Sequence, residues 1–442
     1  MDYDLIVIGS GPAGYVAAIR AGQMGLKTLV IDSKYVGGMC LNWGCIPTKS
    51  IMESAKLFRK IKGAEAFGVM GIDPDALSFD WEKSVKRTMG IVKKLSKGIE
   101  YLWKKNGVSF VKGYASIKSE HEVEVEKQIF STQYIMIATG SKPVPLSLFT
   151  TEKVIELEDL YSQSALPVNP LIFGSTTTAI EIAQFFKMIG ASPVLLLDRY
   201  PILGEENTYL NTQLEKIIKK DKIPMLMLDQ STIKDGQINS TDQSLAFDAI
   251  INCSNRIATL PPMPEGIALK RGFVEVNEHL QSSIPHIYAI GDVNGWAVTA
   301  HSASAQAIAA VNHIKGVAEP IDLSKHPINI YTEPEIATIG YSEEELKTKG
   351  VEFKVSEYFM SANGKALIEG NSDGSVRLLY EPKYSQVLGV QIVASNATDM
   401  ISEAAILMEL EGTIYDVARA VHAHPTVSEV FMEAGAAGMI NV

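Results

Sequence analysis

Two segments of the sequence share one order: an apolar strand, a tight glycine turn, a helix and a second apolar strand. The first runs from Asp4 to Asp32 and the second from Leu171 to Asp198. This order is typical of a βαβ unit that binds a dinucleotide at the N-terminus of its helix. Two such units predict an α/β protein with two dinucleotides. A chain of 442 residues is also too long for one core, so we expect two to three domains.

The first glycine turn carries the complete fingerprint, Gly9-Ser-Gly11-Pro-Ala-Gly14. Gly9 permits the tight turn, Gly11 lets a pyrophosphate approach the backbone, and Gly14 lets helix and strand pack closely. Asp32 ends the second strand, where a carboxylate is placed to bind ribose hydroxyls. The sequence therefore predicts a dinucleotide site here.

The second turn is degraded and reads Gly174-Ser-Thr176-Thr-Thr-Ala179. Alanine is tolerated at the third position, but Thr176 replaces the glycine beside the pyrophosphate. A β-branched side chain there crowds a phosphate, although its hydroxyl could donate a hydrogen bond. The alternative is a Rossmann-shaped domain that binds a nucleotide weakly or not at all.

A pair of cysteines, Cys40 and Cys45, lies in the stretch GGMCLNWGCIPTKS. One distorted turn at a helix start can bring two cysteines within disulfide distance. A thiolate at a helix N-terminus is stabilised by the dipole, and Lys49 would add a positive charge. The pattern favours a redox dithiol; the alternatives are two buried, reduced cysteines or half of a metal site. The third cysteine, Cys253, is expected in the core.

The pattern changes from Pro327 onward, where short alternating strands flank helices without a nucleotide signature. This predicts an α+β domain. It ends in HAHPTVSE, where Glu429 follows His424 by five residues. The carboxylate could orient the imidazole and raise its basicity. It could instead bond to the backbone of Thr426 as a capping box, and the spacing alone favours the cap.

Composition and charge restrict the partners. The formal net charge of −11 argues against nucleic acid and anionic membranes as partners. No apolar run approaches the roughly 20 residues of a transmembrane helix. The start of the sequence has no basic leader, and three cysteines are too few for a disulfide framework. We therefore expect a cytoplasmic protein.

Several segments together resemble the pyridine nucleotide-disulfide oxidoreductases, which are flavin-dependent. They are GSGPAGYVAAIRAGQMGLKTLVID, GGMCLNWGCIPTKS, IATGSKP, IYAIGD, EPEIATIGYSEEE and HAHPTVSE. The resemblance covers essentially the whole chain. It implies two Rossmann-like dinucleotide-binding domains plus a C-terminal α+β dimerisation domain. The implied boundaries are 1–145 and 265–322 for the FAD-binding domain, 146–264 for the NAD-binding domain and 323–442 for the dimerisation domain.

The resemblance also implies roles for individual residues. Cys40 is the implied interchange thiol, Cys45 the thiol beside the flavin, His424 the base, and Glu429 the group that orients it. The implied FAD contacts are Gly9, Gly11, Gly14, Asp32, Lys49, Ala115, Thr139, Gly140, Asp292 and Ala300. The implied NAD contacts are Gly174, Thr176, Ala179, Glu181, Asp198 and Arg256. Lys49 and Glu181 also match the ion pair that the family has near its flavin.

The implied activity is oxidation of dihydrolipoyl groups, with FAD and NAD as cofactors and no metal. The implied partners are a second copy of the chain and the lipoyl domain of a 2-oxoacid dehydrogenase or related multienzyme complex. Departures from the family at the second glycine turn and at 255–259 put the nicotinamide half-reaction in question. The alternatives are a reductase for another small disulfide that uses NAD(P)H, and a homologue with impaired nicotinamide binding that senses redox state or has a structural role.

Overall fold

The computed structural model of the chain describes residues 1–149, 152–241, 243–296, 298–317 and 321–440. Its contacts divide the chain into two compact units. Unit 1 comprises Met1–Thr150, Val154–Leu166 and Ser254–Leu323. Unit 2 comprises Thr151–Lys153, Pro167–Cys253 and Ser324–Val442.

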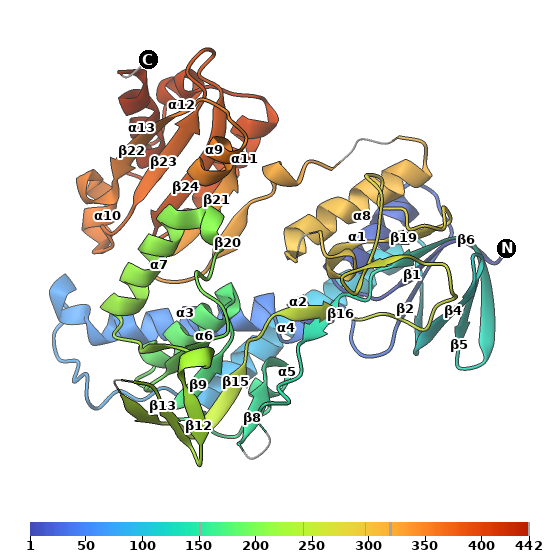
Figure 1. The fold of residues 1–442 in the computed structure, drawn as a ribbon, viewed down its shortest axis with the longest axis horizontal. Helices are drawn as coiled ribbons and strands as arrows, with labels where there is room; N and C mark the ends of the chain where they lie inside the picture. Colours follow the sequence, from blue (N-terminus) through green and yellow to red (C-terminus); the bar gives the residue numbers. More distant parts are fainter. Residues whose placement is uncertain (150–151, 242, 297, 318–320, 441–442) are drawn as a thin grey trace. The chain divides into compact units, whose positions relative to one another are not determined.

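Unit 1 is built on a parallel sheet with strand order β3-β2-β1-β6-β19. The strands are β1 (Tyr3–Ile8), β2 (Thr28–Asp32), β3 (Ser109–Lys112), β6 (Gln128–Ile137) and β19 (Ile287–Ala289). Helices α1 (Pro12–Gln23) and α8 (Ala300–Ile314) pack together beside the sheet (Figure 1). The alanines of α1 are fully buried because small side chains let a helix approach its neighbours closely.

Strand β6 also belongs to an antiparallel meander with β4 (Ala115–Ser119) and β5 (Glu122–Val125). Its first residues pair with β5, and its later residues pair with β1 and β19. One strand therefore links the meander to the parallel sheet.

Three helices surround the cysteine segment: α2 (Gly38–Asn42), α3 (Cys45–Lys62) and α4 (Trp81–Lys105). Helix α3 packs against α4. Asp80 caps α4 by accepting a hydrogen bond from the Lys83 N–H. The sequence predicts a helix start at the cysteine pair, and α3 begins at Cys45 itself.

The segment SKPVPL at 141–146 follows β6, and its sequence predicts a linker. Its first residues form β7 (Ser141–Pro143), which pairs antiparallel with β16 (Arg256–Ala258). The linker expectation was wrong there, because the pairing partner lies far along the chain and leaves no local signal. A second short pair, β17 (Leu269–Lys270) and β18 (Phe273–Val274), completes unit 1.

Unit 2 contains the second predicted βαβ unit. Four parallel strands lie in the order β11-β10-β9-β15. They are β9 (Pro170–Phe173), β10 (Val194–Leu197), β11 (Met225–Met227) and β15 (Ala249–Asn252). The helices are α6 (Thr177–Met188) and α7 (Thr208–Lys220), and a small antiparallel sheet follows with β12 (Thr232–Lys234), β13 (Gln237–Asn239) and β14 (Ser244–Ala246).

The C-terminal part of unit 2 is an antiparallel sheet of order β20-β21-β24-β23-β22, with helices packed on it (Figure 1). The strands are β20 (Ile328–Ile330), β21 (Glu335–Gly340), β22 (Lys354–Phe359), β23 (Ser375–Tyr380) and β24 (Val387–Ala394). The helices are α9 (Glu343–Thr348), α10 (Gly364–Glu369), α11 (Ala397–Glu409), α12 (Ile414–Arg419) and α13 (Glu429–Met439). This agrees with the α+β expectation.

Unit 2 joins the second Rossmann segment to the α+β segment because polar contacts connect them. The hydroxyl of Tyr209 lies 2.6 Å from Ser375 Oγ, and the guanidinium of Arg377 lies 4.0 Å from the Tyr209 ring centroid. The three-domain boundaries given above stay a prediction. Within the described ranges, no helix combines the length and apolarity needed to cross a bilayer.

Candidate functional site

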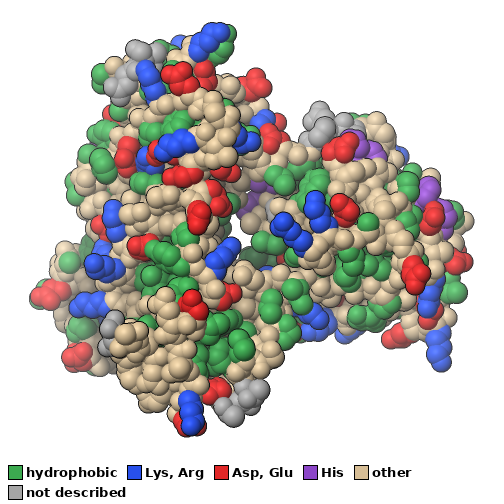
Figure 2. Space-filling view, in the orientation of Figure 1, with side chains coloured by type: hydrophobic (Ala, Val, Ile, Leu, Met, Phe, Trp, Pro, Cys, Tyr) green, Lys and Arg blue, Asp and Glu red, His purple; other side chains and the backbone are tan. Residues whose placement is uncertain are grey.

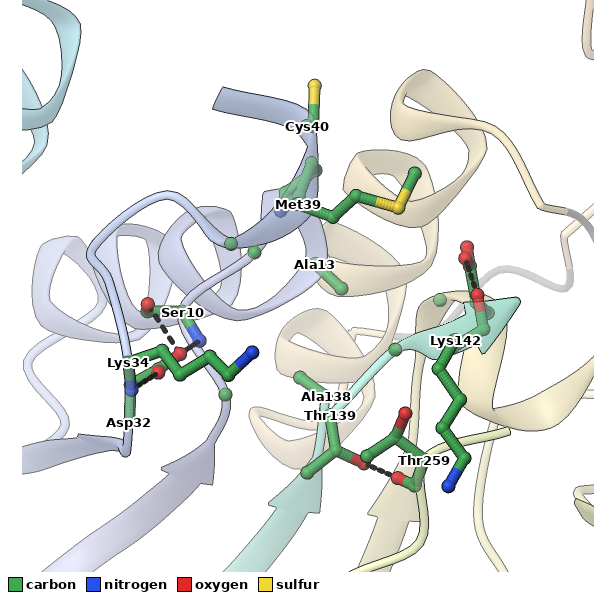
Figure 3. Close-up of a pocket in the computed structure, with 18 of the residues that line it drawn as sticks. Ser10, Ala13, Asp32, Lys34, Met39, Cys40, Ala138, Thr139, Lys142 and Thr259 are labelled. Atoms are coloured by element: carbon green, nitrogen blue, oxygen red, sulfur yellow. Dashed lines mark hydrogen bonds between the residues drawn. The ribbon is translucent and has the colours of Figure 1, made fainter. Parts of the chain in front are cut away.

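A cavity of about 570 Å³ opens at the carboxyl ends of β1, β2 and β6 in unit 1. This edge of a parallel sheet is where α/β proteins bind nucleotides. Most of the residues predicted to contact FAD line it: Gly9, Gly11, Asp32, Ala115, Thr139, Gly140, Asp292 and Ala300. Both Cys40 and Cys45 also line it. Figure 3 shows Asp32 and Ser10 at one end of the cavity and Cys40 on the short helix α2, away from Asp32.

The first glycine turn fits a phosphate group. A Cβ on Gly9, whose φ is +105°, would lie 2.3 Å from the Ala138 carbonyl oxygen. A Cβ on Gly14 would lie 2.0 Å from the Gly9 carbonyl oxygen, so Gly14 serves helix packing and does not line the cavity. A Cβ on Gly11 would meet nothing closer than 3.9 Å. Its absence therefore leaves open space at the N-terminus of α1, where backbone N–H groups favour an anion.

The carboxylate of Asp32 is held in place by backbone and side-chain donors. Its Oδ2 accepts hydrogen bonds from Ser10 N at 2.8 Å and Ser10 Oγ at 2.7 Å, and its Oδ1 accepts from Lys34 N at 2.8 Å (Figure 3). A carboxylate offers about four acceptor positions, so capacity remains for ribose hydroxyls. The end of the cavity that Ser10 and Asp32 line is thus complementary to the phosphate and ribose of a dinucleotide.

The opposite wall contains contacts that the sequence did not reveal. Thr139 Oγ1 donates to the Thr259 carbonyl at 2.5 Å, and Ser141 Oγ donates to Asp292 Oδ2 at 2.5 Å (Figure 3). Arg256 donates to Ser141 Oγ at 2.7 Å and lies 5.6 Å from the centroid of the Trp43 ring. Arg256, grouped with the NAD contacts from the sequence, thus belongs to unit 1 and braces this wall.

The two cysteines stand on neighbouring helices. Cys40 lies within α2, and Cys45 is the first residue of α3, after the N-cap Gly44. Their side chains are hydrogen-bonded to each other. This contact, together with burial and the charge of Cys45, raises the pKa of the Cys40 thiol, while the positive charge of Lys49 lowers it. Cys45 stands at the N-terminus of α3, where the helix dipole stabilises a thiolate.

The alternatives for the cysteine pair do not fit this geometry. Cys40 and Cys45 are only partly buried, whereas Cys253 is 3% exposed and lies in the core as expected. The one group of three metal-type ligands among the described residues does not include either cysteine. The close pair fits a redox disulfide on the wall of the cavity.

The second glycine turn reproduces the backbone pattern of the first. Ser175 N donates to Asp198 Oδ1 at 2.9 Å, as Ser10 N does to Asp32. The difference lies at Thr176, the N-cap of α6. Its hydroxyl accepts from Ala179 N at 3.1 Å and donates to the Cys253 carbonyl at 2.8 Å. Gly11, the N-cap of α1, has no side chain and makes no such bond. The Thr176 hydroxyl therefore occupies a backbone N–H donor of α6, whereas no side chain occupies the corresponding donor of α1.

Two polar side chains of α6 are buried and face the start of the α+β segment. Glu181 Oε1 accepts from Tyr331 N at 2.9 Å, and Gln184 Oε1 accepts from Glu333 N at 2.8 Å. Glu181 is only 2% exposed. These bonds anchor the second Rossmann helix to the segment that follows Ser324 within unit 2.

The carboxylate of Glu429 combines the two roles that the sequence set against each other. Its Oε1 lies 2.9 Å from His424 Nδ1, and its Oε2 accepts from Thr426 N at 2.8 Å. The bonds to Thr426 N and His424 lower the pKa of Glu429. A helix start at Thr426 was wrong: α13 begins at Glu429 after the N-cap Ser428, and Thr426 Oγ1 donates to the Ala423 carbonyl.

His424 and its neighbour His422 differ in the use of their ring nitrogens. His424 Nδ1 donates to the carboxylate, which leaves Nε2 with its lone pair on a side chain that is 80% exposed in the single chain. His422 has Nδ1 2.9 Å from the Ala420 carbonyl and Nε2 3.0 Å from Glu403 Oε2. Of these two histidines, only His424 therefore presents a ring nitrogen whose lone pair is free.

Known families match nearly the whole chain. A model described as pyridine nucleotide-disulphide oxidoreductase matches residues 3–307. A second model, the dimerisation domain of the same family, matches residues 326–435.

Known proteins give the same result. A dihydrolipoyl dehydrogenase of Bacillus subtilis is 34% identical over 97% of each chain. One of Thermus scotoductus is 34% identical over 98% of this chain and 97% of its own. Among solved structures, LpdA from Mycobacterium tuberculosis aligns with a TM-score of 0.89 at 22% identity, covering 98% of this chain and 99% of its own.

A flavoprotein disulfide reductase, RclA from Escherichia coli, aligns with a TM-score of 0.85 at 20% identity, covering 99% of each chain. At these identities the two solved structures support the fold alone. The fold class predicted from the sequence is confirmed. From the matches of the family models and the curated relatives, we conclude that this chain belongs to the pyridine nucleotide-disulphide oxidoreductase family.

Proposed function

We propose that the protein oxidises dihydrolipoyl groups on carrier proteins to lipoyl groups and passes the electron pair to NAD. One observation carries this proposal: two hydrogen-bonded thiols lie on the wall of the dinucleotide cavity in a chain about one-third identical to dihydrolipoyl dehydrogenases. The decisive experiment is a steady-state assay with free dihydrolipoamide and NAD. Absence of NADH formation by protein that contains FAD would contradict it.

The residues of the dithiol site divide the chemistry between them. With Cys40 and Cys45 joined as a disulfide, His424 Nε2 accepts a proton from the substrate thiol, and the thiolate attacks the Cys40 sulfur. Cys45 leaves as a thiolate, stabilised at the start of α3. The second substrate thiol then displaces Cys40 and closes the lipoyl disulfide, so two electrons enter the cysteine pair. FAD, when bound, supplies the electron transfer from this dithiol to NAD.

The residues of the cavity would hold FAD by its polar parts. Gly11 leaves room for the pyrophosphate at the N-terminus of α1, and Asp32 accepts from ribose hydroxyls. Thr139, Asp292 and Ala300 lie on the remaining wall. Lys49 supports thiolate formation through its charge on the cysteine pair.

The protein acts as a homodimer in this proposal. The dimerisation model covers the segment that carries His424 and Glu429. Since His424 is exposed in the single chain and its Nε2 faces no described acceptor, we assign it to the cysteines of a second copy. The lipoyl domain of a 2-oxoacid dehydrogenase or related complex is the proposed substrate carrier. The cytosol is the proposed compartment, because the chemistry uses reduced thiols.

The proposed NAD site is the second glycine turn of unit 2. Asp198 is positioned to accept from both ribose hydroxyls, and a 2′-phosphate would face its carboxylate, so NAD should be preferred over NADP. The guanidinium of Arg199 donates to the Ser175 and Ile202 carbonyls at 3.4 Å each, which turns it toward the backbone. The side chain of Thr176 takes up space at the N-terminus of α6, where the pyrophosphate of NAD would bind.

Replacing Thr176 with glycine is expected to lower the Michaelis constant for NAD, because it frees the N–H groups of α6 for the pyrophosphate. It should also cost about 0.5–1.5 kcal/mol of stability through the lost bond to the Cys253 carbonyl. Rapid mixing should show unchanged flavin reduction by dihydrolipoamide. As a control, Asp198→Ala should weaken NAD binding and narrow its advantage over NADP. An unchanged Michaelis constant for NAD in Thr176→Gly would contradict the proposal that the pyrophosphate of NAD binds at this turn.

Gly11→Val is expected to give protein with little FAD, because its side chain would fill the space beside α1. The measurement is the ratio of flavin absorbance to protein absorbance after incubation with FAD. Gly90→Val is the matched control, because a Cβ there meets nothing within 4 Å and Gly90 lies on α4, outside the cavity. Full FAD content in Gly11→Val would show that the pyrophosphate does not bind at this turn.

A further inference from the structure

We propose that Glu120, His121 and His286 form a binding site for a divalent transition-metal cation, for which Zn²⁺ is the probe. These three residues are the one group of at least three metal-type side chains found among the described residues. They lie in unit 1, at the meander rather than at the dinucleotide cavity. The proposal does not depend on the proposed redox activity.

The backbone positions the three residues through strand β6. Glu120 and His121 are the two-residue turn between β4 and β5, and His286 immediately precedes β19. The His121 carbonyl accepts from Thr132 N at 2.8 Å, and the His286 carbonyl accepts from Ile135 N at 3.0 Å. Both histidines are therefore fixed to the same strand although they are far apart in the sequence.

The ring of His121 is held in the tautomer that a metal requires. Its Nδ1 lies 3.0 Å from the Thr132 carbonyl oxygen. A carbonyl can only accept, so Nδ1 carries the proton and Nε2 keeps its lone pair. A histidine that donates its other N–H to a carbonyl is the usual arrangement around a bound metal.

The ring of His286 has a nitrogen that a bound metal could satisfy. Its Nδ1 is buried and has no hydrogen-bond partner among the described residues. A buried polar atom without a partner is destabilising, so it calls for an explanation. The rings of His121 and His286 have centroids 4.7 Å apart and an interplanar angle of 54°, which is a converging arrangement rather than a parallel stack.

The donor set matches the chemistry of zinc. One candidate ligand atom from each residue lies within 4.8 Å of the others. Zinc bonds imidazole nitrogen at about 2.0–2.1 Å, so two ligand atoms at the tetrahedral angle stand about 3.4 Å apart. Rotation of the exposed Glu120 side chain and of the two imidazole rings must bring the ligand atoms closer together by up to about 1.4 Å. Two imidazoles and one carboxylate leave a fourth position for water, which gives an open tetrahedral site.

The site is accessible from solvent. Glu120 is exposed, and His121 and His286 are half-buried. Figure 2 shows histidine surface next to acidic side chains, close to the place where Figure 1 labels β6 and β19. A cation there would tie the β4–β5 turn to the start of β19 and add a cross-link to the meander.

The test is calorimetric titration of Zn²⁺ into the FAD-loaded protein, with Cys40 and Cys45 oxidised so that their thiols do not bind metal. We expect one tight Zn²⁺ per chain. His121→Gln and His286→Gln should each weaken it by at least about tenfold. His279→Gln is the matched control, because its ring stacks on His313 in the same unit and is not part of the group. Zn²⁺ should raise the midpoint of thermal unfolding of the wild type and of His279→Gln, but not of His121→Gln.

Two results would overturn the proposal. One is the absence of binding to the wild type at millimolar Zn²⁺. The other is equal affinity in the wild type and in His121→Gln, which would place the metal elsewhere. If His286→Gln does not fold, His121→Gln still tests the proposal. His121 lies in a turn, and its replacement leaves the backbone bond from Thr132 N intact. Circular dichroism and FAD content verify that each variant is folded.

Discussion

Cys40→Ser and Cys45→Ser are each expected to reduce dihydrolipoamide oxidation to background while the protein retains FAD. Each change removes one of the two sulfur atoms that form the disulfide, so the substrate thiolate has no disulfide to attack. Flavin content should stay normal, because the dinucleotide end of the cavity, with Gly11 and Asp32, is left intact. The measurements are NADH formation and the flavin absorbance of the purified variants.

The third cysteine provides the control for this experiment. Cys253 is buried in unit 2, and its backbone N–H and carbonyl bond to Phe173 and Thr176. Cys253→Ala should therefore keep nearly full activity. Substantial turnover in Cys40→Ser or Cys45→Ser would exclude the disulfide as the entry point for electrons.

His424→Gln should slow thiol–disulfide exchange by roughly 10²–10⁴-fold, the range for loss of a positioned acid–base group. The amide cannot take a proton from the substrate thiol. Rapid mixing with dihydrolipoamide should show the loss in flavin reduction, with unchanged FAD content. His422→Gln is the matched control, since both nitrogens of His422 are already engaged and its loss should have little effect on the rate.

Glu429 variants separate its two contacts. Glu429→Gln keeps an acceptor for one of its partners, whereas Glu429→Ala loses both bonds, to His424 and to Thr426 N. A rate loss in Glu429→Ala that approaches that of His424→Gln supports the orienting role. A rate unchanged by His424→Gln would rule out this histidine as the base. A stable, fully active monomer would contradict its assignment to the second copy.

The sequence predicted those parts of the site that local spacing specifies. The two βαβ units, the glycine turn at Gly9 and the acid at Asp32 follow from short-range patterns, and the structure contains them. The helix start at the cysteine pair was also predicted, and α3 begins at Cys45. The α+β character after Pro327 followed from its alternating strands.

Contacts between distant segments could not be predicted in this way. Ser141 and Arg256 meet because β7 pairs with β16, and no local pattern announces that pairing. The dual use of Glu429 was missed for another reason: spacing treats a carboxylate as one acceptor, whereas its two oxygens bond different partners. The bond from Thr176 Oγ1 to the Cys253 carbonyl was also missed, because Cys253 follows β15 and lies far along the chain from Thr176.

The bonds within 423–429 determine how this base could be transferred to another protein. Glu429 fixes the His424 ring and the Thr426 backbone together, Thr426 Oγ1 bonds to Ala423, and Asn363 Nδ2 donates to the Thr426 carbonyl at 3.0 Å. A designer who grafted the histidine and glutamate alone would lose the loop that sets their separation. The smallest segment that could carry the proposed base to another protein is therefore the whole heptapeptide, followed by a helix that starts at its last residue and supported by one asparagine from outside.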